Sequence, residues 1–313
     1  MTREAQTVLV TADAFESGLR ALDRDASDPR AGLFGPHSQM WRIARESGVF
    51  LGAGAALLLQ LAHPFVAYGI SDHSRALHDP IARFHRTFSP IFTMIFGTPA
   101  EAIAAARRVR HIHDHINGRL GDGAPYSAHD TDALHWVHMT LWHTAMRVYE
   151  NVITPLSKPE KDQFIIDVNR FAILFGIAPD RQDATWAGFE ARFAAVLASH
   201  TLAVTAPARR IADHFVGRNR ESFGRHLPRW YTTVTADLLP PALASGFGLS
   251  RDDAKAHDTW RNIARWYHRA PRTIRDVAPY HEAHARLRDR RPSLMTAGLN
   301  RVWLGRARLG AGT

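Results

Sequence analysis

The sequence predicts an all-α protein that forms a single multi-helix domain, and three observations support this prediction. Alanine, leucine and arginine, which favour helices, dominate the composition, whereas runs of β-branched residues, which favour strands, are scarce. Residues that start and stop helices recur along the chain at distances that suit helices. No segment alternates strictly between apolar and polar residues, and no fixed-period repeat or low-complexity linker divides the chain. We therefore expect one helical domain over residues 32–290, between a polar lead-in of residues 1–31 and a polar tail of residues 291–313.

The lead-in is expected to contain one short helix, and the first long apolar segment follows at residues 49–70. This segment is almost uncharged and long enough to cross a bilayer. Gln60, His63 and Pro64 near its centre would be costly in lipid, which favours a helix buried in the protein. We expect this helix to cover residues 48–61 and to be interrupted at the His63–Pro64 step.

Two helices are expected to begin where a capping residue precedes a proline. Asp79 and Thr98 are each followed by proline, the pattern of an N-cap and a first helical position. The first helix would cover residues 80–96, with a bend at Pro90, and the second residues 99–117, because a glycine follows each of them. Further helices are expected from about Ser38 and Ser157 and over residues 131–152, 186–199, 205–216, 226–236, 251–268 and 276–288.

The composition excludes several kinds of metal and cofactor site. The chain has 313 residues and no cysteine, which rules out disulfides, thiolate-bound zinc, iron–sulfur clusters, thiolate-ligated haem and covalently attached haem. A metal or haem must therefore be held by histidine, carboxylate, methionine or tyrosine, and the chain has 19 histidines. No Walker loop, Gly-x-Ser-x-Gly elbow or dinucleotide-binding glycine motif is present, which argues against common hydrolases and nucleotide enzymes.

The formal net charge of +9 would suit nucleic acid or an anionic membrane as a partner. The arginines are spread along the chain, with the densest run at residues 286–291, and no helix-turn-helix, zinc-finger or RNA-binding motif accompanies them. We therefore expect no nucleic-acid partner and a peripheral contact with phospholipid. The N-terminus carries early charges and lacks the apolar core of a secretory signal, which predicts a cytoplasmic location.

His113 differs from the two histidines beside it. At about 100° per residue, His113 lies in the middle of an apolar stripe, whereas His111 and His115 fall on the polar face. A neutral imidazole in an apolar groove suits the proximal ligand of a haem iron, but it also suits a core histidine bonded to a backbone carbonyl. His111 and His115 have the spacing of two zinc ligands, but their polar face predicts solvated side chains. The apolar stripe also contains Ala106, Val109, Ile116 and Leu120.

The preceding helix carries a second group of candidate residues. Arg83, Arg86 and Thr87 have helical spacing and share one face, which continues into Ile91 and Met94. Two cations and a hydroxyl that lead into an apolar strip suit the polar end of a pocket, where they would bind dioxygen or a haem propionate. The same pattern also suits an ordinary salt-bridged first turn.

Three other histidines have roles that the sequence leaves open. His63 and His73 flank the break in the apolar segment, and a buried His63 would satisfy backbone groups that the break frees. His138, together with Tyr149, lies on an aromatic-rich helix and either lines a pocket or belongs to the core.

The chain resembles, over about residues 32–250, the oxygenase family that contains the mycophenolic-acid pathway protein MpaB and the latex-clearing rubber oxygenases. The resemblance rests on an ordered set of motifs rather than on any one of them. They are GLFGPHSQMWRI at 32–43, LLLQLAHPFVAYGISDHS at 57–74, Arg-x-x-Arg-Thr at 83–87, VRHIH at 109–113, WVHMTLWHT at 136–144 and LLPPAL at 238–243.

This resemblance implies a helical fold with a globin-like core that binds a non-covalent haem b. The proximal histidine of the family's Val-Arg-x-x-His segment falls on His113, and the distal residues of its Arg-x-x-Lys-Thr segment fall on Arg83 and Thr87. Arg86 replaces the lysine, which keeps the charge but changes the hydrogen-bond geometry. The other residues expected to contact the haem are Met94, Val109 and Ile116.

The resemblance also implies a substrate class, an olefinic or isoprenoid lipid that reacts with dioxygen. We therefore expect a haem b-dependent oxygenase in which His113 binds the iron and Arg83, Arg86 and Thr87 lie on the oxygen side. The apolar walls of residues 49–61 and 131–152 would receive the substrate. Two alternatives stay open, namely a haem-binding or gas-sensing protein without turnover and a cofactor-free, basic, membrane-associated helical protein.

Overall fold

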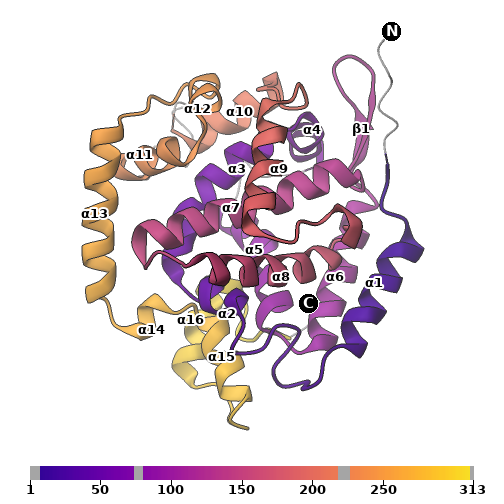
Figure 1. Ribbon diagram of the computed structural model, residues 1–313, viewed down its shortest axis with the longest axis vertical. Coiled ribbons are helices and arrows are strands. Elements are labelled where there is room, and N and C mark those ends of the chain that lie inside the picture. Colours follow the sequence, from indigo (N-terminus) through magenta and orange to yellow (C-terminus); the bar gives the residue numbers. More distant parts are fainter. Residues whose placement is uncertain (1–7, 74–79, 218–225, 311–313) are drawn as a thin grey trace.

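A computed structural model describes residues 8–73, 80–217 and 226–310 of the chain (Figure 1). The regular secondary structure of the described residues is almost entirely helical. The exception is a two-stranded antiparallel hairpin, β1 (Asn117–Arg119) and β2 (Pro125–Ser127), in which Asn117 pairs with Ser127. The prediction of an all-α single domain is confirmed, whereas the globin-like arrangement of its core stays a prediction.

The helices follow one another in a compact sequence with short connections. They are α1 (Ala12–Arg24), α2 (Gln39–Ala44), η1 (Ser47–Gly52), α3 (Ala53–Leu61), α4 (Pro64–His73), α5 (Pro80–Phe96), α6 (Pro99–His113), α7 (Thr131–Val152), α8 (Lys158–Ile173), η2 (Pro179–Arg181), α9 (Trp186–Ala198), α10 (Ala206–Phe215), α11 (Arg229–Leu238), α12 (Pro241–Gly246), α13 (Asp253–Arg269), α14 (Arg272–Arg275), α15 (Ala278–Arg286) and α16 (Leu294–Leu304).

Helix α7 runs through the middle of the molecule and organises the core (Figure 1). It packs against η1 and α3 on one side and against α13, α8 and α9 on others. Large side chains along its length, Trp136, Met146 and Tyr149, are almost completely buried. The indole nitrogen of Trp136 donates a hydrogen bond to the backbone oxygen of Leu59, at 2.8 Å, and so ties α7 to α3.

Helices α5 and α6 form a packed pair that carries most of the expected site residues. The start of α6 is fixed by a capping box. The Thr98 hydroxyl accepts a hydrogen bond from the Glu101 backbone, and the Glu101 carboxylate accepts one from the Thr98 backbone. Helix α5 continues through Pro90. The expected N-cap Asp79 and the side chain of Arg83 lie outside the described part of the structure.

The C-terminal end of α6 differs from the sequence prediction. The helix was expected to reach residue 117, but it ends at His113, and Asn117 already belongs to β1. The backbone oxygen of Ile116 accepts a hydrogen bond from the Ala128 amide, at 2.9 Å, which a helical Ile116 would have directed along the helix instead. Pairing with β2 therefore competes with the last helical turn and replaces it.

The apolar segment around residue 60 is bent, as its sequence predicts. Ser47–Leu61 and Pro64–His73 together have the length and composition of a membrane span, but they meet at an angle of 103°. No single helix in the described part of the chain is long and apolar enough to cross a bilayer. Leu58, Leu59 and Leu61 are completely buried within the protein.

Both ends of the described chain belong to the same core as the middle. Within the segment expected as a polar lead-in, α1 buries Phe15 and Leu19 in the main hydrophobic cluster. Residues 291–310, expected as a polar tail, contain α16, which packs against α5 and α15. Leu304 and Leu309 are buried there.

Candidate functional site

His113 is the last residue of α6, and its ring faces α1 and the end of α8. It lines a narrow cavity of about 210 Å³, part of it open to solvent, together with Phe15, Ala106, Val109, Arg110, His129, Leu174 and Phe175. Burial lowers the pKa of His113 to about 4, so the imidazole is neutral at pH 7. Between described residues, the ring takes part in a contact with His129 but in no hydrogen bond.

Besides His113, the polar residues that line this cavity are His129 and Arg110, and Asp114 pairs with His129. The His129 Nε2 donates a hydrogen bond of 2.7 Å to Asp114 Oδ1, and its ring centroid lies 6.2 Å from that of His113. The hydrogen bond from His129 lowers the pKa of the Asp114 carboxyl. His129 lies in the turn-rich loop before α7, where local periodicity gives no indication of its partner.

His111 lies on the outer face of α6 and His115 in the turn that follows the helix, and both side chains are exposed. The centroids of their rings lie 5.1 Å apart, and His111 Nδ1 lies 3.8 Å from Asp114 Oδ2. Among the described residues, no group of three or more His, Asp or Glu side chains has the arrangement of a metal site.

The structure does not enclose the expected oxygen-side residues in one site with His113. Arg86 and Thr87 are exposed on α5, and the Arg83 side chain lies outside the described part of the structure. Met94 is completely buried and lines neither the His113 cavity nor the larger pocket described below. Arg86, Thr87 and Met94 therefore lie on helix α5, as expected, but they do not form one site with His113.

The two apolar residues expected beside His113 separate from each other. Val109 lines the His113 cavity, one helical turn from the imidazole. Ile116 lies beyond the end of α6 and packs over Gly69 of α4. The early end of the helix explains this separation, because Ile116 no longer follows the helical period.

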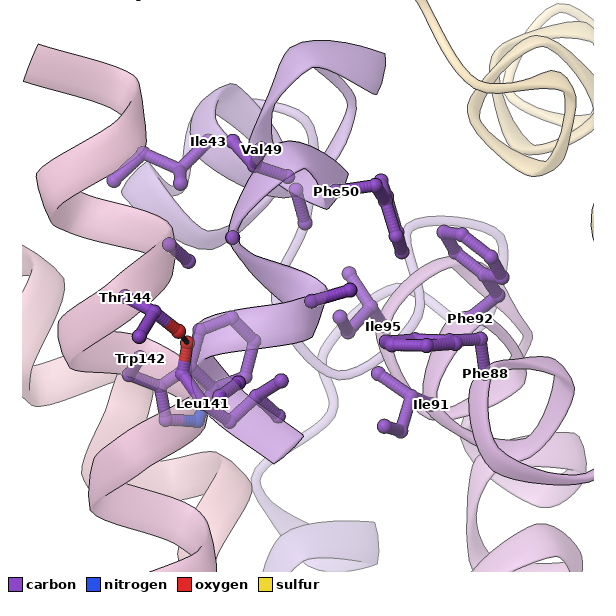
Figure 2. Close-up of a pocket in the computed structure, with 15 residues that line it drawn as sticks. Ile43, Val49, Phe50, Phe88, Ile91, Phe92, Ile95, Leu141, Trp142 and Thr144 are labelled. Carbon is purple, nitrogen blue, oxygen red and sulfur yellow. Dashed lines mark hydrogen bonds between the residues drawn. The ribbon is translucent and has the colours of Figure 1, made fainter. Parts of the chain in front are cut away.

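A larger pocket lies between η1, α5 and α7 (Figure 2). It has an empty volume of about 520 Å³, part of it open to solvent. Apolar side chains dominate its wall, and the only polar atoms in it belong to Thr144 and Trp142. The Thr144 hydroxyl donates to the backbone oxygens of Thr140 and Leu141, so it is already satisfied. The lining residues are Ile43, Ala44, Val49, Phe50, Gly52, Ala53, Ala56, Phe88, Ile91, Phe92, Ile95, Leu141, Trp142, Thr144 and Ala145.

This pocket matches the expectation that residues 49–61 and 131–152 provide apolar walls. Small residues open the space on the side of η1 and α3, where Gly52, Ala53 and Ala56 face the cavity. The side of α5 supplies two phenylalanines and two isoleucines. The pocket therefore offers a hydrocarbon-like surface and no titratable group.

The other buried histidines lie singly among aromatic residues of the core. His138 stacks on Phe171, with ring centroids 6.1 Å apart, and His143 stacks on Phe193 at 4.0 Å. Burial lowers the pKa of His138 to about 3 and the pKa of His143 to about 4. These contacts indicate core residues.

The histidines at the helix break differ from each other. His63 is buried, and burial lowers its pKa to about 4. Its Nδ1 has no hydrogen-bond partner in the described structure, so it does not satisfy the backbone groups freed by the break. The His73 ring is exposed, and its Nε2 lies 3.0 Å from the backbone oxygen of Asn117.

His113 fits a haem in its chemistry but not in the space around it. A haem iron requires a neutral imidazole without a competing hydrogen bond as its proximal ligand, and the His113 ring meets both conditions among the described residues, although Arg110 and His129 lie beside it. The cavity beside the ring is too narrow for a porphyrin as it stands, and the larger pocket contains no ligating side chain. Haem binding at His113 therefore requires that α1 or the end of α8 move away from α6.

One comparison with known proteins gives a match. Residues 40–275 match the family model described as the catalytic domain of the ER-bound oxygenase mpaB/B' and rubber oxygenase. The match covers most of the chain, from α2 to the end of α14, and includes both cavities apart from Phe15. No curated protein and no solved structure matches the chain.

Proposed function

The chain belongs to the family of the mpaB-type and rubber oxygenases, and we propose that it is an oxygenase that acts on an apolar, olefinic small molecule. The observation that carries this proposal is the pocket between η1, α5 and α7. A wall of aliphatic and aromatic side chains with no titratable group suits a hydrocarbon and excludes a charged substrate, which would lose its hydration without compensation.

Within this proposal, His113 is the residue that holds a non-covalent haem b. Support comes from the neutral state of its ring, from the apolar residues Phe15, Val109 and Leu174 beside it, and from the lack of a hydrogen bond to it among the described residues. Haem would supply the chemistry of dioxygen, which no side chain of this protein offers. The protein would supply orientation and exclusion of water, and Val109 would contact the cofactor because it already lines the cavity beside His113.

The remaining expected residues take their proposed roles from α5. Thr87 and Arg86 would provide hydrogen-bond donors and a fixed positive charge on the oxygen side, together with Arg83. Their α5 helix also contributes Ile91 to the substrate pocket. One helix would thus connect the polar residues that act on dioxygen with the apolar wall that binds the alkene.

An absorption spectrum of protein produced with adequate haem supply tests the cofactor. We expect a Soret band in the wild type and in His111→Ala, whose ring is exposed, and its loss in His113→Ala. A band of equal intensity in His113→Ala would overturn the ligand assignment. Colourless wild-type protein, even after haem is added, would favour a cofactor-free membrane-associated protein instead.

Oxygen consumption separates an enzyme from a haem-binding protein without turnover. We expect the haem-loaded wild type to consume dioxygen in the presence of an isoprenoid alkene and to leave the saturated analogue of that alkene unchanged. A Soret band without alkene-dependent consumption would instead identify a haem carrier or gas sensor.

A further inference from the structure

Helix α16 presents apolar side chains to solvent, while the polar residues Thr296 and Asn300 are buried on its inner face together with Leu304. Leu294 is 93% exposed, Val302 66% and Met295 59%. With Gly298 and Arg301, these residues fall within an arc of about 120° on the helix, at about 100° per residue. We call these five residues the α16 surface. An exposed apolar cluster of this kind marks a site of contact rather than an ordinary solvated face.

Hydrogen bonds fix the inner face of α16. They therefore define the orientation of the helix that exposes its apolar residues. Asn300 is completely buried and donates hydrogen bonds to Glu282, at 2.6 Å, and to the backbone oxygen of Ala307, at 3.1 Å. The amide of Leu309 donates to the same Glu282 carboxylate. Rotation of α16 to bury Leu294 would break the hydrogen bond between Asn300 and Glu282.

The chain segment that contains the α16 surface carries a strong excess of positive charge. Residues 288–310 contain a single carboxylate, Asp289, which pairs with Arg30 at 3.1 Å. Five arginines of this segment are exposed, and within the described part of the chain none of them forms an ion pair. They are Arg288, Arg290, Arg291, Arg301 and Arg308. An apolar centre with an arginine rim complements the acyl chains and anionic headgroups of a bilayer.

The underside of α16 contacts the pocket. Trp303 packs against Phe50, with ring centroids 5.1 Å apart, and against Phe92 at 5.8 Å. Both phenylalanines line the pocket, and together with Phe88 they lie on the side nearest the pale yellow C-terminal ribbon in Figure 2. A short aromatic cluster therefore separates the pocket from the helix that carries the exposed apolar residues.

We propose that the α16 surface docks on a bilayer that contains anionic phospholipid. On the basis of the proposed function, the apolar substrate then reaches the pocket from the membrane, past Trp303 and Phe50. A second copy of the chain is a poorer occupant, because a two-fold interface at this surface would bring the two arginine rims together.

Co-sedimentation with vesicles tests the docking. We expect the protein to bind vesicles of equimolar phosphatidylcholine and phosphatidylglycerol, to bind pure phosphatidylcholine at least about tenfold more weakly, and to lose affinity as salt rises. The double variant Leu294→Gln/Val302→Gln should lose about tenfold or more in affinity, and Arg290→Gln/Arg291→Gln should weaken both the affinity and its salt dependence. Ile112→Gln, which changes an exposed residue of α6, is the matched control and should bind like the wild type.

Three results would overturn the proposal. They are equal binding to both kinds of vesicle, binding that neither double variant reduces, and a wild-type dimer that Leu294→Gln/Val302→Gln dissociates in light scattering. The replaced residues are exposed, so an unchanged melting temperature confirms that the variants are folded.

Substrate delivery is tested separately from catalysis. We expect Leu294→Gln/Val302→Gln to slow oxygen consumption about tenfold when the alkene is embedded in anionic vesicles, and to leave it unchanged when the alkene is dissolved in detergent. If the variant consumed oxygen at the wild-type rate on both forms of the substrate, delivery through α16 would be contradicted. Absence of turnover on both forms in the wild type would contradict the proposed function and leave the vesicle-binding result unaffected.

Discussion

At the scale of single residues, solvent exposure separates the residues that the proposed chemistry uses from those that hold the fold together. Arg86 and Thr87 are exposed on α5, so their replacement removes no packing. The effect of replacing either residue on activity can therefore be measured without interference from unfolding. Replacement of a residue beside a buried cofactor seldom allows this.

We expect Arg86→Ala and Thr87→Val to change the free energy of unfolding by less than about 0.5 kcal/mol, the usual range for exposed positions. Each should retain the Soret band of the wild type and lower the rate of alkene-dependent oxygen consumption about 100-fold, as loss of one preorganised donor does in other enzymes. Arg108→Ala, an exposed arginine on α6, is the control. Wild-type turnover in both α5 variants would remove them from the oxygen side.

The apolar pocket can be filled from α7. Ala145 lines it and is almost fully buried, so Ala145→Phe would place a ring in the empty space. We expect affinity for an apolar fluorescent ligand to fall at least about tenfold, while the melting temperature falls less than it would at a fully packed position, because part of the new ring enters the pocket. Ala105 is as deeply buried but lines neither cavity, so Ala105→Phe should lower stability by about 1–3 kcal/mol and leave ligand binding intact in the protein that remains folded.

Local periodicity explains which histidines are exposed but not what covers the buried one. The period of α6 separates the exposed His111 from His113, whereas His115, which is also exposed, lies in the turn just after the helix ends. Phe15 and Leu174, which close the cavity over His113, are far away in the sequence. Their approach depends on tertiary packing of α1 and α8, which no local pattern encodes.

At the scale of elements, η1 is held in place by a buried charge. Glu46, which precedes η1, is 2% exposed and accepts hydrogen bonds from Arg272 and from the Tyr267 hydroxyl, both at 2.8 Å. The amide of Gly48 in η1 donates to the same tyrosine oxygen, at 3.1 Å. Because η1 supplies Val49 and Phe50 to the pocket, this network sets the shape of the proposed substrate site.

We expect Glu46→Ala to lower the free energy of unfolding by about 3–5 kcal/mol, because it removes the carboxylate that pairs with the buried Arg275 at 3.5 Å. Glu46→Gln should be less destabilising, since the amide oxygen still accepts from Tyr267. The matched control is Glu16→Ala, which breaks the exposed pair with Arg107 and should change stability by at most about 1 kcal/mol. Urea denaturation measures all three, and equal effects of Glu46→Ala and Glu16→Ala would contradict a role of Glu46 in holding η1.

The sequence predicts the starts of helices better than their ends. Capping residues specify a start locally, as Thr98 does for α6. The end of α6 depends instead on a hairpin whose partner strand lies ten residues away. Helix α16 was expected as part of a polar tail, since Thr296 and Asn300 interrupt the apolar residues of its inner face, where Leu304 is also buried. Buried hydrogen bonds fix that helix, and hydrophobic periodicity does not report them.

At the scale of the whole molecule, neutral histidines in the core make folding sensitive to acid. Burial lowers the pKa of His138 to about 3 and that of His63 to about 4, below the ordinary value of about 6.5. Between these values the unfolded chain binds protons that the folded protein does not. Stability is therefore fully present above about pH 6.5 and is lost as the pH falls toward about 4.

His138→Phe tests this dependence, because the ring that stacks on Phe171 is kept while the titrating nitrogens are removed. One depressed histidine accounts for about 2 kcal/mol of stability lost between pH 6.5 and pH 5, at about 1.4 kcal/mol per unit. The variant should therefore lose about 2 kcal/mol less than the wild type between pH 7 and pH 5, in urea denaturation at each pH. The exposed His111→Gln should follow the wild type, since its ring keeps contact with water in both states. If His138→Phe showed the full wild-type loss over this interval, the acid sensitivity would have to come from groups outside the aromatic core.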